Sequence, residues 1–242
     1  EIPNKKLKPI FIIGVPRCGS TLIEKVIASG DNYIPIGEET GIFSKFIGEK
    51  INKKESLNED KEKLQVKIYE EYKEKGLIQE KNNFFFTDKS LDNFFYISLI
   101  KEIFPSAKII NCKRDPFSSI MSIIKNNLRD VTWAHNLDHI FKFFDIYFKK
   151  ISYFKKKFPA LIYDLEYEEF IENPEKESKK LFRFCNLPWN VKCLEFYKRK
   201  DFISQTASNL QIRRSIFKTE FSKYQPYKEL LIKYKSRYKW FN

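Results

Sequence analysis

Continuous apolar runs alternate along the chain with runs that are apolar on one face only. The first apolar run, at residues 9–14, contains Ile and Phe side chains without a polar interruption. This composition is typical of a strand buried on both faces of a parallel sheet. After a break at residues 14–21, apolar residues recur at helical spacing from Leu22 to Ile27. A strand followed by a helix is therefore predicted near the start of the chain.

The same reading predicts four more strands, interspersed with helices. The strands are expected at residues 33–36, 84–88, 108–113 and from 161 onward, and the helices at 58–75, 91–104, 116–128 and 133–157, with further helices in the remainder. This alternation predicts an α/β fold: a P-loop-like parallel β-sheet flanked by helices, with a helix-rich C-terminal part. Ligands of such sheets bind at the carboxyl ends of the strands, so the strand-to-helix breaks are the places to look for chemistry.

Length and composition narrow the class of protein. We expect residues 1–242 to form a single domain, and 42% apolar and 17% aromatic residues exclude the disordered and low-complexity classes. No apolar run approaches the ~20 residues that a membrane helix needs, so no membrane span is predicted. The sequence begins at Glu1 rather than Met. Upstream sequence is therefore expected to be missing, together with any targeting signal that it holds.

Basic residues exceed acidic ones by 45 to 32, which gives a formal charge of +13. Such a surplus favours an acidic partner: a phosphate-rich ligand, nucleic acid, an acidic peptide or an anionic surface. The lysines are spread along the chain, so solvation of the surface explains many of them equally well. No RNA-binding signature, zinc finger or basic helix repeat is present in the sequence, and we therefore expect no nucleic acid as partner.

The cysteines and histidines do not form a recognisable metal motif. We expect four reduced thiols, without zinc or disulfides, at Cys18, Cys112, Cys185 and Cys193. Together with the lack of a signal-peptide pattern, this favours a cytoplasmic location. His135 and His139 are the only histidines. Both are expected on the helix at 133–157 as surface or packing residues, neither catalytic nor zinc-binding.

The break at residues 14–21 has the glycine spacing of a phosphate-binding loop, G-x-x-x-x-G-K-[ST], with Ser20 in the place of the lysine. Backbone amides of such a turn, and the dipole of the helix that follows, favour an anion. Arg17 supplies the cation that the missing lysine would give. An ordinary turn with a helix cap at Ser20 or Thr21 is the alternative. Without the lysine, metal-dependent transfer from a nucleoside triphosphate is disfavoured.

A second strand-to-helix break repeats this arrangement. Arg114 follows the strand at 108–113, and Ser122 lies eight residues later on the next helix. Together they could clamp a second phosphate. The two breaks therefore imply a ligand with two separated phosphate-like groups.

These residues together resemble the sulfotransferases that use 3′-phosphoadenosine-5′-phosphosulfate (PAPS), most nearly the tyrosylprotein sulfotransferases and the bacterial sulfotransferases that follow tetratricopeptide repeats. The resemblance is carried, in the family's order, by residues 15–22, 37–40, 87–90, 113–122, 167–170, 187–189, 206–208 and 221–224. It implies transfer of a sulfuryl group from PAPS to an acceptor hydroxyl, with no metal required. It also implies that the chain could be the C-terminal catalytic part of a longer one.

By this resemblance the first loop binds the 5′-phosphosulfate, and the second break binds the 3′-phosphate. The implied donor-binding residues are Arg17, Cys18, Gly19, Ser20, Thr21, Arg114, Ser122, Tyr167, Ser208 and Lys218. Cys18 stands where the family often has Ser or Thr, and a backbone amide serves equally at that place. Lys218 corresponds to a late 3′-phosphate cation of the family, although a surface lysine fits the sequence as well.

The resemblance also implies the two catalytic residues. Lys89 corresponds to the lysine that stabilises the leaving group, whereas the residues alone favour a solvated lysine paired with Asp88. Glu39 corresponds to the carboxylate that takes the proton of the acceptor, with Glu38 beside it as the alternative if the alignment is one place off. Charge that builds on a leaving phosphate oxygen does call for a cation, and the acceptor hydroxyl calls for a base.

Several alternatives remain open at this stage. A P-loop kinase or NTPase-like phosphotransferase would use ATP and magnesium, and a non-catalytic nucleotide-binding module would bind without turnover. For a sulfotransferase, PAPS and its product 3′-phosphoadenosine-5′-phosphate (PAP) are the expected partners. The acceptor could be a tyrosine in an acidic peptide, a glycan or a small metabolite. The oligomeric state is also open, with a homodimer among the options.

Overall fold

The computed structural model describes residues 6–30, 34–54, 61–78, 84–128, 131–199 and 221–241. Its centre is a four-stranded sheet in the order β2-β1-β3-β4, in which every neighbouring pair is parallel. The strands are β1 (Ile10–Gly14), β2 (Thr87–Asp88), β3 (Lys108–Lys113) and β4 (Ile162–Glu166). The predicted α/β fold with a parallel sheet is confirmed.

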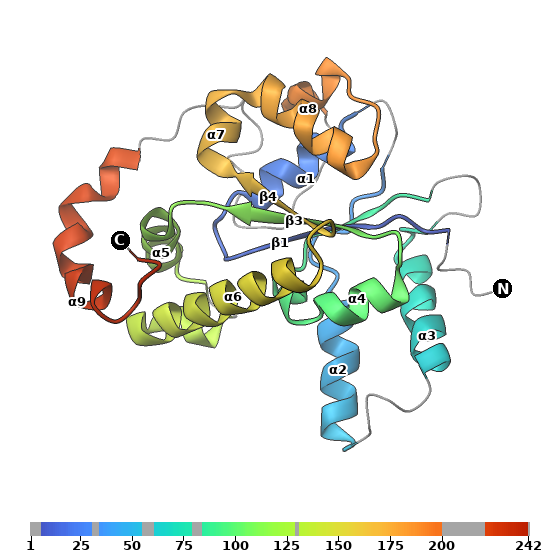
Figure 1. Cartoon of the computed structure of the whole chain (residues 1–242), viewed down its shortest axis with the longest axis horizontal. Coiled ribbons are helices and arrows are strands. Elements are labelled where there is room, and N and C mark those ends of the chain that lie inside the picture. The colour runs from blue at the N-terminus through green and yellow to red at the C-terminus, as the bar shows by residue number, and fades with distance from the viewer. Residues whose placement is uncertain are drawn as a thin grey trace.

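Helices cover both faces of this sheet. Figure 1 shows α1, α7 and α8 on one side and α4 and α6 on the other, with α2 and α3 projecting beyond them. The α-helices are α1 (Ser20–Ala28), α2 (Ile42–Asn52), α3 (Lys61–Glu74), α4 (Ile97–Ile103), α5 (Pro116–Asn126), α6 (Leu137–Lys157), α7 (Tyr167–Glu172), α8 (Pro174–Cys185) and α9 (Ile232–Lys235). The 3₁₀ helices are η2 (Leu91–Phe95), η3 (Thr132–His135), η4 (Val191–Lys198) and η5 (Phe221–Leu231).

The burial of the strand residues explains why helices cover both faces of the sheet. All five residues of β1 are buried, as the uninterrupted apolar run predicts, because helices pack on both faces of the strand. The C-terminal segment packs on α6, where the Phe141 ring stacks on Tyr234 with the ring centroids 3.9 Å apart. Trp240 lies against the same ring and donates from Nε1 to Asp145, 3.3 Å away. These contacts hold η5 and α9 near α5, beside the carboxyl ends of the strands (Figure 1).

The predicted strand at residues 33–36 is wrong for its described part. Residues 34–36 carry no strand, although the Thr87 amide donates to the Pro35 carbonyl over 3.0 Å. Proline has no N–H group to return such a bond, so a regular ladder cannot continue there. The strand predicted at 84–88 is reduced to Thr87–Asp88, which pairs with β1 at the edge of the described sheet.

Four predicted helices have different bounds in the structure. The helix predicted at 58–75 is observed as α3 (Lys61–Glu74), and residues 58–60 lie outside the described residues. The helix at 91–104 is divided at Tyr96 into η2 and α4. The helix at 116–128 ends at Asn126, since Asn127 adopts a left-handed conformation with φ +43°. The helix at 133–157 begins only at Leu137, because Asn136 caps it by accepting from the His139 amide. His135 therefore lies on η3 rather than on the long helix.

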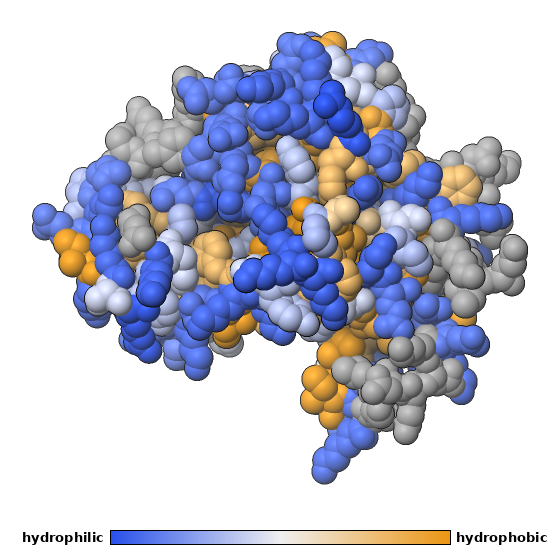
Figure 2. All heavy atoms as spheres, viewed as in Figure 1, coloured by the Kyte–Doolittle hydropathy of each residue, from blue (hydrophilic) through white to orange (hydrophobic). Residues whose placement is uncertain are grey.

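Hydrophilic side chains cover most of the face seen in Figure 2, and apolar side chains reach the surface over α2. Ile51, near the end of α2, is 66% exposed. No described helix combines the length and apolar character needed to cross a membrane.

Candidate active site

The loop after β1 is shaped by two residues in the left-handed region. Arg17 has φ +71° and Gly19 has φ +95°. A residue other than glycine seldom adopts such a φ, and positions of this kind concentrate at functional sites. Gly19 is the N-cap of α1, and Ser20 and Thr21 lie inside the helix. The alternative of a helix cap at Ser20 or Thr21 is therefore wrong. The first amides of α1 have no acceptor within the helix, which leaves them available to an anion.

Arg17 joins the two strand-to-helix breaks. Its Nε donates to Ser122 Oγ over 3.1 Å, and its carbonyl accepts from Arg114 Nη1 over 2.8 Å. Residues predicted separately to hold two phosphate groups thus lie in one network. Burial lowers the pKa of Arg17, and the neighbouring Arg114 charge lowers it further. Two guanidinium groups this close favour an anion between or beside them.

Tyr167, the first residue of α7, closes the same site from the end of β4. A Cβ atom on Gly19 would lie 2.3 Å from the Tyr167 ring, so only glycine permits this approach. The Arg114 guanidinium lies 4.9 Å from the centroid of the same ring. The aromatic ring therefore contacts both the loop and the arginine. Tyr224 of η5 is buried and lies within electrostatic range of Arg17.

Cys18 is buried under the loop rather than exposed in it. A Cβ atom on Gly14 would lie 2.6 Å from Cys18 Sγ, and the Cys18 amide donates to the Val15 carbonyl over 3.2 Å. All four cysteines are free and buried. Among the residues that the structure describes, there is no group of His, Cys, Asp or Glu side chains suited to hold a metal ion.

Lys89 directly follows β2, at the carboxyl end of the strands where the two-arginine network also lies, and its side chain pairs with Glu39. The two side chains form an ion pair with Nζ and Oε1 2.9 Å apart. Lys89 is 0% exposed and Glu39 is 58% exposed. Burial opposes the charge on Lys89, but Glu24 and Glu39 outweigh it and raise the pKa of the ammonium group. The alternative of a solvated lysine paired with Asp88 is wrong, because the side chain is buried and its partner is Glu39.

Asp88 instead organises the polypeptide around the ion pair. Its carboxylate accepts from Tyr72 and Thr40, each over 2.6 Å, and from the Ser90 amide over 2.8 Å. These bonds tie α3, the 37–40 turn and η2 to the end of β2. Glu38 forms its ion pair with Lys25 instead, with Oε1 3.8 Å from Nζ, and it adds only a weaker electrostatic contribution at Lys89. Of the two adjacent glutamates, Glu39 is the one beside Lys89.

Glu24 of α1 is a buried carboxylate that the sequence analysis did not single out. It is 0% exposed, and its Oε1 accepts from Thr87 Oγ1 over 2.7 Å and from the Glu38 amide over 3.1 Å. Burial raises the pKa of Glu24 to about 7, against the opposing effect of Lys89. The one sequence feature that could have singled out Glu24 is its place in the helix next to the glycine-containing loop. A sequence alone does not distinguish a buried glutamate from a solvated one.

Two further predicted donor-site residues, Ser208 and Lys218, lie outside the described residues. His135 and His139 are both exposed. The structure thus gathers Arg17, Gly19, Ser20, Thr21, Arg114, Ser122, Tyr167, Lys89 and Glu39 at the carboxyl edge of the sheet.

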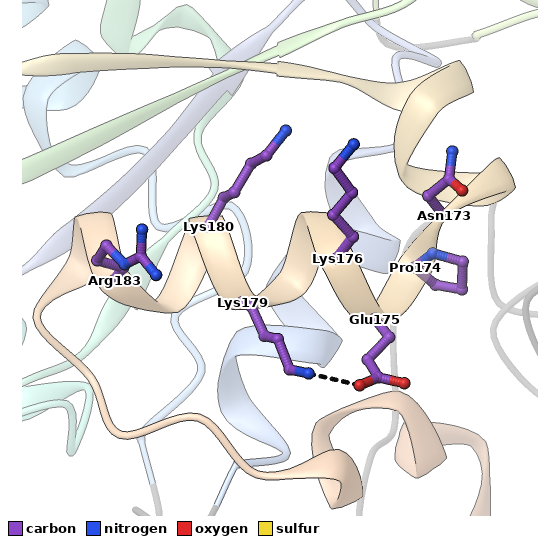
Figure 3. Close-up of a pocket in the computed structure, with 7 residues that line it drawn as sticks. All are labelled: Asn173, Pro174, Glu175, Lys176, Lys179, Lys180 and Arg183. Atoms are coloured by element: carbon purple, nitrogen blue, oxygen red, sulfur yellow. Dashed lines mark hydrogen bonds and ion pairs between the residues drawn. The ribbon is translucent and has the colours of Figure 1, made fainter.

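A separate groove of about 630 Å³ runs along α8 and is lined by Asn173, Pro174, Glu175, Lys176, Lys179, Lys180 and Arg183. Figure 3 shows Lys176 and Lys180 on one side of α8, with Lys179 on the other side in an ion pair with Glu175. None of these residues is among the predicted site residues. The groove carries part of the basic surplus away from the two-arginine network.

The fold and the loop define an α/β protein in which the first strand leads, through a loop with two left-handed residues, into a helix N-terminus that suits an anion. The profile of the sulfotransferase family matches residues 9–191. The chain belongs to the sulfotransferase family.

Relatives and solved structures agree with this assignment. The chain is 29% identical to an uncharacterised Aquifex aeolicus protein, over 95% of this chain and 32% of that protein. It is 27% identical to protein-tyrosine sulfotransferase 1 of Danio rerio, over 78% of this chain and 56% of that protein. The chain therefore spans about a third to a half of the length of these two relatives.

Two solved structures share the fold. The sulfotransferase domain of the Synechococcus PCC 7002 olefin synthase matches with a TM-score of 0.63 and 18% identity, over 89% of this chain and 86% of that one. A mouse sulfotransferase complexed with PAP matches with a TM-score of 0.54 and 14% identity, over 96% and 86% of the two chains. The resemblance to the sulfotransferase family is confirmed.

Proposed function

We propose that this protein transfers a sulfuryl group from PAPS to an acceptor hydroxyl, with Glu39 as the base and Lys89 as the stabiliser of the leaving group. The observation that carries the proposal is the Lys89–Glu39 ion pair, 2.9 Å long, at the same sheet edge as the two-arginine network. Membership of the family supports the choice of donor, and PAP is bound in the mouse sulfotransferase that shares the fold.

The chemistry of the site fits a donor that carries two separated anionic groups. The amides of the first turn of α1 and the Arg17 side chain would hold the 5′-phosphosulfate, with Cys18 contributing to the loop. Arg114 and Ser122 would hold the 3′-phosphate, which distinguishes PAPS from an ordinary nucleotide. Tyr167 would line the pocket with its ring. Ser208 and Lys218 complete the proposed donor site from outside the described residues.

Each catalytic residue has one task in the transfer. Glu39 accepts the proton of the acceptor hydroxyl as that oxygen forms its bond to sulfur. The bond from sulfur to the bridging phosphate oxygen breaks, and Lys89 stabilises the charge that builds on this oxygen. Lys89 suits this task because it is buried and charged, since an electrostatic interaction is stronger where water is excluded.

For the acceptor, we propose the phenol of tyrosine in an acidic peptide. Protein-tyrosine sulfotransferase 1 of Danio rerio is similar over 78% of this chain, and the formal charge of +13 favours an acidic partner. We also propose that residues 1–242 act as one catalytic domain. The greater length of the two relatives is consistent with further segments in a longer protein.

The experiment that tests the function is transfer of radiolabelled sulfate from PAPS to a tyrosine in an acidic peptide, with Mg²⁺ and with a chelator. We expect product under both conditions. A P-loop kinase would instead transfer phosphate from ATP and require Mg²⁺. Binding of PAP without any transfer would indicate a non-catalytic module and would contradict the proposal.

Thermal shift tests the donor by itself. PAP should raise the melting temperature, because it carries both the 5′- and the 3′-phosphate, while adenosine 5′-monophosphate should raise it much less. An equal response to both nucleotides would contradict the assignment of PAPS.

A further inference from the structure

Glu24 lies where three segments of the candidate site meet. It belongs to α1, the helix that begins at the phosphate loop. Its Oε1 accepts one hydrogen bond from Thr87, in the strand that leads to Lys89, and one from the amide of Glu38, next to Glu39. One oxygen atom therefore links the elements that carry the donor loop, the lysine and the base.

Backbone contacts show how closely the two catalytic segments are joined. The Lys89 amide donates to the Glu38 carbonyl over 2.7 Å, and the Gly37 amide donates to Thr87 Oγ1 over 3.3 Å. A Cβ atom on Gly37 would lie 2.2 Å from the Thr87 carbonyl, so the turn and the strand are in close contact. Glu38 itself has φ +49°, a conformation that needs support from its surroundings.

We propose that Glu24 is a positioning residue, which holds the 37–39 turn against the end of β2 and thereby sets the separation of Glu39 from Lys89. The proposal rests on the proposed function, because it assigns Glu24 a part in that same reaction. The Glu24 side chain accepts hydrogen bonds from Thr87 and the Glu38 amide, through which it holds the two segments, and its charge also helps to raise the pKa of Lys89.

Burying the Glu24 carboxylate costs free energy, and this cost supports a role for Glu24 beyond packing. A buried ionisable group loses its hydration, and an apolar side chain of similar size would avoid that loss. The charged groups that face Glu24 are Lys89, Lys25 and Glu38. The two lysines offset part of the lost hydration, while the hydrogen bonds to Oε1 give the carboxylate its direction.

Three variants separate positioning from packing. Glu24→Leu removes the acceptor, Glu24→Gln keeps a carbonyl oxygen in its place, and Thr87→Val removes the hydroxyl donor. Glu175→Gln on α8 is the matched control, because Glu175 is exposed and pairs only with Lys179 among the contacts seen in Figure 3. Each variant is measured for kcat at saturating substrates and for PAP affinity by calorimetry.

Amide hydrogen exchange gives a readout that does not depend on activity. The segments compared are residues 35–40 and 87–90, with residues 176–185 of α8 as the reference. We expect Glu24→Leu to speed exchange in the first two segments only. We also expect it to lower kcat roughly tenfold or more, since the two hydrogen bonds to Glu24 Oε1 are lost, while PAP affinity stays within about threefold of the wild type.

The other variants complete the pattern. Glu24→Gln should restore exchange close to the wild-type rate, Thr87→Val should change exchange and kcat in the same direction as Glu24→Leu, and Glu175→Gln should change neither. Unaltered exchange at 35–40 in folded Glu24→Leu would overturn the proposal, as would an equal loss of PAP affinity and kcat. If Glu24→Leu does not fold, unaltered exchange in Thr87→Val overturns it in its place.

Failure of the proposed function has a different signature. It appears as a wild-type protein that transfers no sulfuryl group, whatever the exchange rates of the variants are. Failure of the positioning role appears as wild-type activity with unaltered exchange in the variants.

Discussion

Nζ of Lys89 and Oε1 of Glu39 lie 2.9 Å apart, although the two residues are 50 positions apart in the sequence. The lysine is buried and the glutamate is largely exposed, so the pair spans the boundary between the protein interior and the solvent. In the proposed mechanism, this arrangement would present Glu39 as a base to the acceptor and Lys89 as a cation to the donor.

The first prediction concerns the base. Glu39→Gln should preserve the shape of the site and the affinity for PAP, but it should lower kcat by roughly 10²–10⁴-fold, because the amide cannot take a proton. The defect should shrink with more acidic phenols, which need less help from a base. Steady-state kinetics over a series of substituted phenols checks both expectations.

Glu38→Gln is the control for this assignment, because the Glu38 carboxylate pairs with Lys25, whereas Glu39 forms the ion pair with Lys89. It should retain most of the activity. If Glu38→Gln is inactive and Glu39→Gln active, the base has been assigned one residue too far along the chain.

The second prediction concerns the leaving group. Lys89→Ala should lower kcat by roughly 10²–10³-fold, because the charge on the phosphate oxygen loses its cation. Unlike the Glu39 defect, this one should persist with acidic phenols, since it arises on the donor side of the transfer. The same series of acceptors measures it, and a Lys89 defect that vanishes with the most acidic phenol would contradict the assigned role.

The third prediction concerns the two arginines. Arg17→Ala and Arg114→Ala should each weaken PAP binding by about 10–150-fold, the range expected for loss of one charge-assisted contact. Isothermal calorimetry with PAP measures the affinity. Arg183→Ala on α8 is the matched control, since it removes an exposed arginine of the separate groove. Unchanged PAP affinity in both the Arg17→Ala and the Arg114→Ala variants would refute the proposed donor site.

The fourth prediction concerns Gly19. Gly19→Ala should destabilise the protein by about 1–2 kcal/mol or more, because φ is +95° and the new Cβ would meet the Tyr167 ring at 2.3 Å. PAP affinity should fall as well, since the loop must shift. Gly48→Ala in α2 is the control: its Cβ has nothing within 4 Å, and alanine favours a helix. Urea unfolding should rank Gly48→Ala at or above the wild type and Gly19→Ala below it.

The fifth prediction concerns pH. The pKa of Glu24 rises from 4.5 to about 7 on folding because of burial. Between these values the folded protein holds a proton that the unfolded chain has released, so this contribution to stability is complete below pH 4.5 and is lost as the pH rises to 7. The free energy of unfolding that is lost in this way is roughly 3 kcal/mol at most.

Glu24→Gln removes this titration. The difference in unfolding free energy between wild type and Glu24→Gln should therefore shift against the wild type as the pH rises from 5 to 8, as measured by urea unfolding at each pH. A difference that is independent of pH would show that Glu24 titrates normally in the folded protein.

Much of the fold could be predicted because its signals are local. The run at 9–14 contains the fully buried strand β1 (Ile10–Gly14), since an uninterrupted apolar run has few alternatives to a strand in a parallel sheet. The strand at 108–113 also has the predicted bounds. The errors occur where a single residue overrides the periodicity. Pro35 lacks an amide donor, and Asn136 and Asn127 set helix ends with their own conformations.

The sequence by itself determined the four strands of the sheet and most of the helices between them, the glycine-containing loop with Arg17, and the resemblance that singled out Lys89 and Glu39. Only the tertiary structure decided that Lys89 is buried against Glu39 rather than solvated beside Asp88. It also decided that Glu24 is buried and bonded to the segments that carry Lys89 and Glu39, and that Tyr167 packs on Gly19. The physical reason is that periodicity reflects which face of an element is buried, whereas the burial and charge of a polar group depend on neighbours from distant parts of the chain.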